Sequence, residues 1–450
     1  MGNRKIHIVN LGCPKNLVDS EVMAAALSGG GFEISSREET AHIILVNTCA
    51  FILPAKKESI EEILRLAEWK KRGRCRYLIV TGCLAQRYGK MLRKQLPEVD
   101  LFLGTGEVGG ILGHVNRLLK DGPEEQPFFD SNPSFLMNSA HRRLLSTHYS
   151  AYLKIAEGCS NHCSYCIIPS VRGEFRSRQL EDIIRETESL AFEGVREVIL
   201  IAQDTASYGR DLAGEQSLGR LLREIAAVDG IRWIRVLYAH PASVSAEILE
   251  AIAGEEKVCK YIDMPVQHID DDILSAMRRR GGSNLIKDRI LQARSLIPGL
   301  VLRTSIMVGF PGETTARFNR LLAFIKETRF QNLGVFVYSR EEGTAAAEMS
   351  GHVPEREKEK RRDILMEEQA AISCACNRSL VGSVMEVIIE GKSDLPGYLV
   401  ARHRGQSPEI DGVTYVKAAN AAAGDIINCV IRSADEYDLF AEAVDEPRRQ

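Results

Sequence analysis

The chain has 450 residues, of which 44% are hydrophobic and 26% charged, and its formal net charge is −3. This length and composition are typical of a folded protein with roughly two to four domains, and the nearly neutral charge excludes a general attraction to nucleic acid or to membrane surfaces. The N-terminus lacks the apolar segment of a secretory signal, and no run of about 18 apolar residues predicts a membrane span, so we expect a cytoplasmic protein.

The first segment, residues 4–120, alternates β-branched runs with helical patterns. Strands are predicted for KIHIVNLGC (5–13), HIILVNTC (42–49) and YLIVTGC (77–83), and helices for 18–27, 56–71 and 86–96. Strands that alternate with helices indicate parallel βα units. We therefore expect an α/β domain with an open parallel sheet, followed at 121–147 by a linker rich in Pro, Asn, Ser and Asp.

The alternation resumes in a second predicted domain, residues 145–375. Strand-like runs occur at 149–159, 196–203, 231–239, 260–267, 300–310 and 332–339. Six βα units are too few for an eight-unit barrel and predict a partial (β/α)6 barrel, whose active groups would lie at the carboxyl ends of the strands. The densely charged stretch 353–380 is expected to form an exposed connecting helix.

The last predicted domain, residues 378–446, has a different pattern. Short alternating runs occur at 383–391, 397–403, 413–419, 425–434 and 437–444. Gly, Pro and Asp-Gly separate these runs, as they do in antiparallel sheets. We expect a small all-β barrel or sandwich.

The segment EGCSNHCSYCIIPS (157–170) contains three closely spaced cysteines, Cys159, Cys163 and Cys166. In a reducing compartment the eleven cysteines of the chain do not predict a disulfide framework. This spacing suits an iron–sulfur cubane, in which three protein ligands leave one iron free to bind another molecule. A zinc site completed by His162 or by a distant residue is the alternative. Packing is a poor explanation, because the segment is polar.

Three other cysteines, Cys13, Cys49 and Cys83, each end one of the N-terminal strand-like runs. If these strands are parallel neighbours, their carboxyl ends bring the cysteines to one edge of the sheet. A single buried thiol at a strand end is common. Three in equivalent positions favour a second cluster site.

Together these features resemble the radical S-adenosylmethionine methylthiotransferases over residues 5–445. The resemblance rests on LGCPKNLVDSE (11–21), GCSNHCSYCIIPSVRG (158–173), AQDTASYGRD (202–211), YIDMPVQH (261–268), VGFPGET (308–314), VFVYSREEGT (335–344) and SPEIDG (407–412). These stretches are similar to the RimO branch, which modifies a ribosomal protein. The tRNA-modifying MiaB branch typically has Gln at Pro14 and Asn at Asp204. Ala345 and Arg317 depart from the family pattern in loops away from the predicted ligands.

The resemblance implies an N-terminal methylthiotransferase domain, a radical S-adenosylmethionine domain and a C-terminal TRAM barrel. It assigns an auxiliary 4Fe-4S cluster to Cys13, Cys49 and Cys83, here called the auxiliary trio, and a radical-generating 4Fe-4S cluster to the other three cysteines, here called the radical trio. S-adenosylmethionine would be used twice, once to methylate sulfur and once to supply the radical. No catalytic side chain is assigned beyond these ligands.

Two further residues are candidates for binding S-adenosylmethionine. Gln203 ends the strand-like run 196–203, where a barrel places its active groups. Arg303 lies in the run 300–310 and has a guanidinium suited to bidentate pairing with the methionine carboxylate. The alternatives are an ordinary loop polar residue for Gln203 and a structural ion pair for Arg303.

The charge of the last domain bears on the substrate. Residues 380–450 contain 7 Lys plus Arg and 12 Asp plus Glu, so 7 − 12 gives a formal charge of −5. RNA binding needs basic charge, whereas an acidic surface attracts a basic ribosomal protein. We therefore predict an enzyme that methylthiolates the β-carbon of an aspartate in ribosomal protein twelve of the small subunit. Its partners would be that protein, an electron donor and a sulfur donor, with no membrane and no nucleic-acid substrate. The alternatives are methylthiolation of a tRNA adenosine and an iron–sulfur protein without catalysis.

Overall fold

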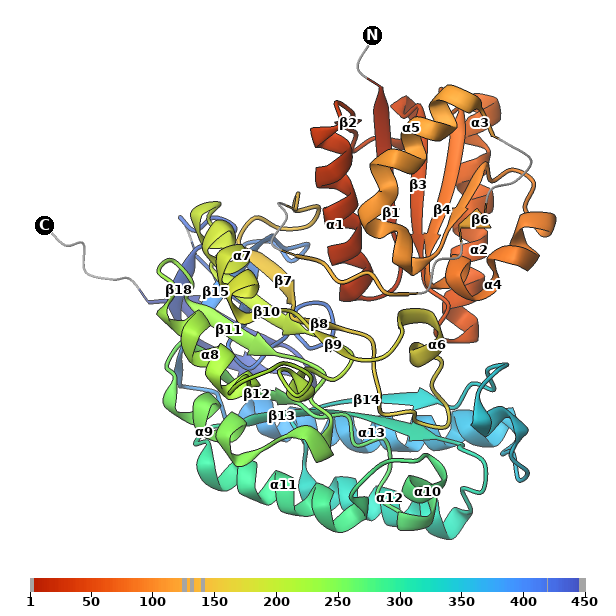
Figure 1. The fold of residues 1–450 in the computed structure, drawn as a ribbon. Coiled ribbons are helices and arrows are strands. Elements are labelled where there is room, and N and C mark those ends of the chain that lie inside the picture. The colour runs from red at the N-terminus through yellow and green to blue at the C-terminus, as the bar shows by residue number, and fades with distance from the viewer. Residues whose placement is uncertain (1–3, 124–127, 130–132, 139–141, 419, 445–450) are drawn as a thin grey trace, which may run out of the picture.

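The computed structural model describes residues 4–123, 128–129, 133–138, 142–418 and 420–444, which form three consecutive modules (Figure 1). The observed modules have the predicted fold classes: an open parallel sheet, a partial barrel of parallel strands and a closed β-barrel. The domain boundaries given above stay predictions. None of the helices in the described ranges is both long and apolar enough to cross a membrane.

The N-terminal module is a parallel sheet with the strand order β2-β1-β3-β4-β5-β6. Helices α1 and α5 pack on one face of the sheet and α2 and α4 on the other, which explains why the central strands β3 and β4 are buried along almost their whole length. The strands are β1 (Lys5–Asn10), β2 (Glu33–Ile34), β3 (Ile43–Thr48), β4 (Tyr77–Gly82), β5 (Leu101–Leu103) and β6 (Phe128–Phe129). The helices are α1 (Pro14–Gly29), α2 (Leu53–Ala67), α3 (Trp69–Arg72), α4 (Cys83–Gln95) and α5 (Ile111–Asp121).

All three helices predicted for this module begin earlier than predicted, and α2 begins at Leu53 and not at residue 56. Helix α1 starts at Pro14 and not near residue 18, because proline is well suited to the first helical position. Helix α4 starts at Cys83 itself, immediately after a glycine with a φ of 94°. Helices α1 and α4 therefore begin at or next to a cysteine of the auxiliary trio.

The second module is a sheet of six parallel strands in the order β14-β13-β12-β11-β10-β7, and its two edge strands do not pair with each other. The strands are β7 (Ser150–Lys154), β10 (Glu197–Ile201), β11 (Trp233–Val236), β12 (Val258–Asp263), β13 (Val301–Val308) and β14 (Asn332–Val337), with a small antiparallel pair, β8 (Ala156–Glu157) and β9 (Arg176–Ser177). The helices are α6 (Ile168–Arg172), α7 (Leu180–Phe192), α8 (Leu218–Ala227), α9 (Ala246–Gly254), α10 (Asp271–Ala276), α11 (Gly282–Leu296), α12 (Thr315–Thr328) and α13 (Glu355–Arg378).

Helix α13 is less exposed than its charged sequence predicts. Leu365 and Ile372 are buried in the core of the second module, and Gln369 donates hydrogen bonds from Nε2 to the carbonyl oxygens of Phe330 and Gln331. Leu365 and Ile372 lie seven positions apart, so they share one face of the helix. A narrow apolar stripe therefore anchors α13 against the barrel.

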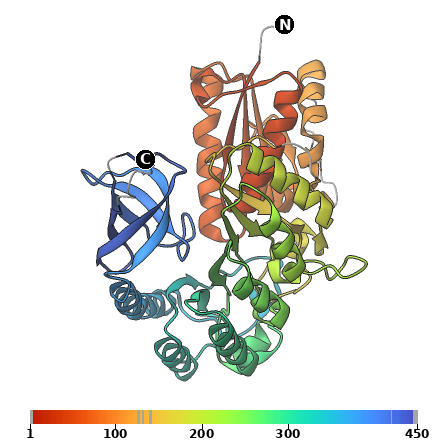
Figure 2. The same ribbon diagram turned by 90° about the vertical axis from the view of Figure 1, so that its left-hand side faces the viewer.

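The third module is a closed barrel of strands in the order β15-β16-β17-β19-β18. Figure 2 shows it beside the partial barrel and separate from the parallel sheet of the N-terminal module. The strands are β15 (Val384–Lys392), β16 (Leu399–His403), β17 (Thr414–Lys417), β18 (Ile426–Ala434) and β19 (Leu439–Ala443).

The modules share a hydrophobic core. One cluster contains Val18 of α1, Trp233 of β11 and Ile388 of β15, all fully buried. The predicted linker at 121–147 lies partly outside the described residues. Within its described part, Arg142 is buried and lies 3.4 Å from Glu21 and 3.1 Å from Glu186. The N-terminal sheet is thereby held at a fixed position over the partial barrel.

Candidate active site

The cysteines of the auxiliary trio follow neighbouring strands. Cys49 and Cys83 come directly after β3 and β4, and Cys13 follows shortly after β1. The three strands are adjacent and parallel, and their last residues are in register. Their carboxyl ends therefore meet at one edge of the sheet, as the sequence predicts.

A glycine allows two of these strand ends to approach closely. Gly12 has a φ of 94°, and a Cβ atom there would lie 2.6 Å from Cβ and 3.0 Å from Sγ of Cys49. These distances are shorter than van der Waals contact, so a side chain at this position would displace Cys49. The backbone just before Cys13 thus packs directly on the Cys49 side chain.

The thiols of the auxiliary trio influence one another's ionisation. Burial raises the pKa of Cys49 to about 12, and the neighbouring Cys83 and Cys13 contribute to the rise. Burial also raises the pKa of Cys83, while the Arg172 guanidinium opposes this rise. Metal ligation requires the thiolate form and replaces the protons. The trio therefore forms a desolvated group of sulfur donors that a metal cluster would deprotonate.

The radical trio lies in the loop after β8. The backbone N–H of Cys159 donates to the carbonyl of Gly173 over 3.0 Å, and that of Cys166 donates to the carbonyl of Cys163 over 3.0 Å. Burial raises the pKa of Cys166 to about 12, with contributions from Cys163 and Cys159. The backbone contacts fold the loop, and the effect of Cys163 and Cys159 on the pKa of Cys166 indicates that the three thiols are neighbours.

The zinc alternative finds no support among the described residues. In the described part of the chain, no three His, Cys, Asp or Glu side chains converge closely enough to hold a single metal ion. A cubane does not need such convergence, because each of its cysteines binds a different iron. His162, the alternative fourth zinc ligand, is 57% exposed, and its Nε2 lies 3.5 Å from Glu174. Assignment of the six cysteines as cluster ligands stays a prediction.

An arginine that sequence analysis did not identify lies against the radical trio. Nη1 of the buried Arg279 lies 4.0 Å from Sγ of Cys163 and 3.4 Å from Oη of Tyr165, and Nη2 donates to the carbonyl of Pro265. A guanidinium in this position offsets the negative charge of thiolate ligands. The only sign in the sequence is the run of three arginines at 278–280, a pattern that is usually exposed.

The two predicted cofactor-binding residues have different surroundings. Nε2 of Gln203 donates to Glu157 over 2.7 Å, and its buried Oε1 has no hydrogen-bond partner among the described residues. Arg303 lies 3.0 Å from Asp263 and 3.3 Å from Asp411, a residue of the third module. Gln203 therefore keeps a free acceptor near the radical trio, whereas Arg303 is engaged in ion pairs. Binding of S-adenosylmethionine by either residue stays a prediction.

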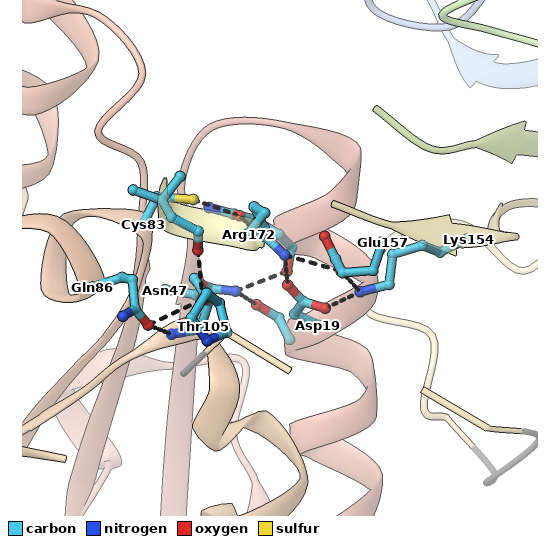
Figure 3. Close-up of polar contacts among 12 residues, drawn as sticks. Asp19, Asn47, Cys83, Gln86, Thr105, Lys154, Glu157 and Arg172 are labelled. Carbon is cyan, nitrogen blue, oxygen red and sulfur yellow. Dashed lines mark hydrogen bonds and ion pairs between the residues drawn. The ribbon is translucent and has the colours of Figure 1, made fainter. Parts of the chain in front are cut away.

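A buried network of charges lies beside Cys83 of the auxiliary trio and includes Glu157, two residues before Cys159 (Figure 3). Nζ of Lys154 donates to Asp19 of α1 and to Glu157, the latter over 2.7 Å. Nη1 of Arg172 donates to Asp19 over 2.7 Å and lies 3.3 Å from Glu157. Burial acts to raise the pKa of Glu157, but the neighbouring Lys154 and Arg172 lower this pKa to about 2. The network thus keeps Asp19 of the N-terminal module in contact with the second module.

The same network reaches both sites. Glu157 accepts a hydrogen bond from Gln203 and directly precedes the loop of the radical trio. At the other end, Arg172 donates to Oδ1 of Asn16, which lies 4.0 Å from Sγ of Cys83. A continuous path of polar contacts therefore connects the auxiliary trio to the residues around the radical trio.

The remaining cysteines lie elsewhere in the fold. They are Cys75, Cys259 and Cys429, which are buried, and Cys374 and Cys376, which are partly buried on α13. All eleven cysteines are free of disulfide bonds. The structure gives no reason to add these five to either site.

Three stretches of the chain match known protein families. Residues 5–104 match the "Uncharacterized protein family UPF0004", residues 153–325 the "Radical SAM superfamily" and residues 381–444 the "TRAM domain". The chain is 57% identical to "Ribosomal protein uS12 methylthiotransferase RimO" of Syntrophus aciditrophicus, over 99% of this chain and 100% of the relative. It is 51% identical to the protein of the same name from Geotalea uraniireducens, over 98% of each.

The chain belongs to the RimO family of methylthiotransferases. Among solved structures, it is similar to the radical S-adenosylmethionine methyltransferase TsrM of Kitasatospora setae, with a TM-score of 0.55 and 15% identity over 74% of this chain and 75% of that one. The enzyme OxsB matches with a TM-score of 0.52 and 12% identity over 82% of this chain and 56% of that one. At these identities the likeness concerns the fold alone.

Proposed function

We propose that this protein methylthiolates the β-carbon of an aspartate in ribosomal protein uS12. The observation that carries the proposal is the presence of two cysteine trios, one at the carboxyl ends of the N-terminal sheet and one in the loop after β8, joined by a buried polar network. Such an arrangement supports a reaction in which one substrate side chain meets two centres in turn.

Two 4Fe-4S clusters and S-adenosylmethionine would supply the chemistry, one cluster by generating the hydrogen-abstracting radical and the other by holding the sulfur to be transferred. The protein would hold each cluster by its thiols and would offset their charge with an arginine, Arg172 beside the auxiliary trio and Arg279 beside the radical trio. The unpaired Oε1 of Gln203 would accept a hydrogen bond from a ligand at the radical trio.

The third module supports a protein substrate. Its described residues include five basic side chains, Lys392, Arg402, Arg404, Lys417 and Arg432. The three arginines are paired with carboxylates, at 2.6 Å to Glu390, 3.1 Å to Glu386 and 2.8 Å to Glu442. Little basic charge is therefore left to neutralise RNA phosphates, while the acidic excess favours association with a basic ribosomal protein.

The proposal also implies partners. Reduction of the radical cluster needs an electron donor, and repeated turnover needs a sulfur donor that replaces the transferred atom. A ribosomal substrate implies that the enzyme acts in the cytoplasm. We propose both donors as partners in addition to uS12.

Mass spectrometry of uS12 and of tRNA tests the proposal. Anaerobically reconstituted protein, supplied with S-adenosylmethionine and reductant, should add one methylthio group to uS12 and none to tRNA. In a strain that lacks the gene, uS12 should lose this group while tRNA modification stays unchanged. Modification of tRNA with unmodified uS12 would contradict the proposal.

A further inference from the structure

Lys15 places a cation between the two cysteine sites. It lies in the first turn of α1, two positions after Cys13. Its side chain crosses to the partial barrel, where Nζ lies 3.1 Å from the centroid of the Tyr238 ring. Tyr238 follows β11 at the carboxyl end of the barrel strands. The ammonium group is thus near the auxiliary trio and at the edge where the barrel places its reactive groups.

No carboxylate in the described part of the chain contacts this cation directly. Burial lowers the pKa of Lys15 to about 8, while the nearby Cys13, Asp263 and Glu157 oppose this shift. Lys15 is only 7% exposed, and among the described residues no hydrogen bond or ion pair is found for its Nζ, which lies over the ring of Tyr238. The other buried cations of this region are paired, since Lys154 and Arg172 both contact Asp19 and Glu157. A buried charge without a counter-ion is costly, and an aromatic face offsets only part of the cost.

The carboxylates that oppose the lowering of the Lys15 pKa, Asp263 and Glu157, are committed to other groups. Asp263 accepts from Nη1 of Arg303 over 3.0 Å and from the backbone N–H of Tyr238 over 3.0 Å. Glu157 accepts from Lys154 and from Gln203, each over 2.7 Å. Neither carboxylate contacts Nζ of Lys15, so the protein presents a positive group whose natural complement is an anion from outside.

We propose that the ammonium group of Lys15 pairs with the side-chain carboxylate of the target residue and so selects aspartate. This inference rests on the proposed function. The carboxylate of aspartate is bonded directly to the β-carbon that receives sulfur, so an ion pair at Lys15 fixes the position of that carbon relative to the auxiliary trio. An asparagine at the target position has the same shape but no charge to pair with the ammonium. A glutamate moves the carboxylate one methylene further from the backbone.

Binding of the two substrate forms tests this assignment. Anaerobically reconstituted enzyme without reductant is titrated with labelled uS12 and with uS12 in which the target aspartate is replaced by asparagine, and fluorescence anisotropy gives each Kd. Wild-type enzyme should bind the aspartate form about tenfold to a hundredfold more tightly, the range expected for a hydrogen bond between charged groups. Lys15→Met should bind both forms nearly equally, and Lys15→Arg should keep the preference for aspartate.

Lys57→Met is the matched control, because Lys57 is an exposed lysine on α2 in the same module, and it should keep the wild-type preference. Equal binding of the two substrate forms by the wild-type enzyme would overturn this inference alone, without any variant. A Lys15→Met enzyme that still prefers aspartate, or that loses the iron of the auxiliary trio, would also overturn it. A wild-type enzyme that does not bind uS12 would overturn the proposed function and this inference together.

Discussion

Nζ of Lys15 lies 3.1 Å from the ring centroid of Tyr238, so the N-terminal module and the partial barrel meet through a cation and an aromatic face. The barrel fixes the position of this ring. Tyr238 has a φ of 63°, and its backbone N–H donates to Asp263 while its carbonyl accepts from the N–H of Thr205. A left-handed backbone in a non-glycine residue persists only where its surroundings impose it. Tyr238 therefore provides a rigid surface against which Lys15 is held.

Replacing the ring should weaken the hold on Lys15. Tyr238→Phe keeps the aromatic face and should bind uS12 as the wild type does. Tyr238→Leu removes a cation–π contact of about 0.5–2 kcal/mol, so its Kd for uS12 should rise by roughly twofold to thirtyfold. Both variants impose the same backbone strain, so the comparison isolates the ring. Equal affinities of the two variants, measured by anisotropy, would show that the ring does not position the ammonium.

The buried network around Arg172 should stabilise the docking of the first two modules. Arg172→Met leaves Asp19 and Glu157 with Lys154 as their shared cation, and breaking a buried ion pair typically costs about 3–5 kcal/mol. The midpoint of urea unfolding, followed by tryptophan fluorescence, should fall accordingly. Arg185→Met serves as the control, because Arg185 is 62% exposed in its pair with Asp182 and such pairs contribute little. Similar midpoints for the two variants would be inconsistent with a stabilising network.

The contact between the partial barrel and the third module should depend on pH. Glu197 is fully buried, and although burial raises its pKa, Arg402 and Arg235 hold that pKa at about 2. Folding therefore favours the ionised form of Glu197. The contribution of this carboxylate to the free energy of unfolding is complete above its pKa in the unfolded chain, which is near 4.5. This contribution is lost as the pH falls from about 4.5 towards 2. Lowering the pKa of one carboxyl group by this amount on folding adds about 3 kcal/mol to the free energy of unfolding.

Trp233 reports on this contact, because its Nε1 donates to Glu386 of the third module over 2.7 Å. In a Trp69→Phe background, the urea midpoint seen by Trp233 fluorescence should fall between pH 5 and pH 3. Glu197→Gln should lower the midpoint at pH 7 and flatten its dependence in the acid range. If the urea midpoint of Glu197→Gln changes with acid pH in the same way as that of its parent, groups other than Glu197 cause the change.

The fold could be predicted from the sequence wherever it depends on local periodicity. Strand-like runs that end in Cys13, Cys49 and Cys83 predict a shared sheet edge, because parallel strands leave only one edge for their carboxyl ends. The spacing of the radical trio is likewise a local property. Helix starts were less predictable, since Pro14 and Cys83 begin helices that the apolar pattern shows only later.

Contacts between modules could not be predicted. The pairs of Lys15 with Tyr238, Asp19 with Arg172 and Glu197 with Arg402 join residues more than 150 positions apart in the chain. Arg279 reaches the radical trio from a run of arginines that resembles an exposed patch. Such contacts depend on how complete modules pack, and neither hydrophobic period nor motif spacing carries that information.

The central claim is that the chain holds two separate clusters, and iron and sulfide analysis after anaerobic reconstitution tests it most directly. Wild-type protein should bind about eight irons, and Cys49→Ala and Cys163→Ala should each retain about four. Cys374→Ala, a partly buried cysteine of α13, should keep about eight. An unchanged iron content in Cys49→Ala or Cys163→Ala, or the loss of all iron from either one, would contradict two independent sites.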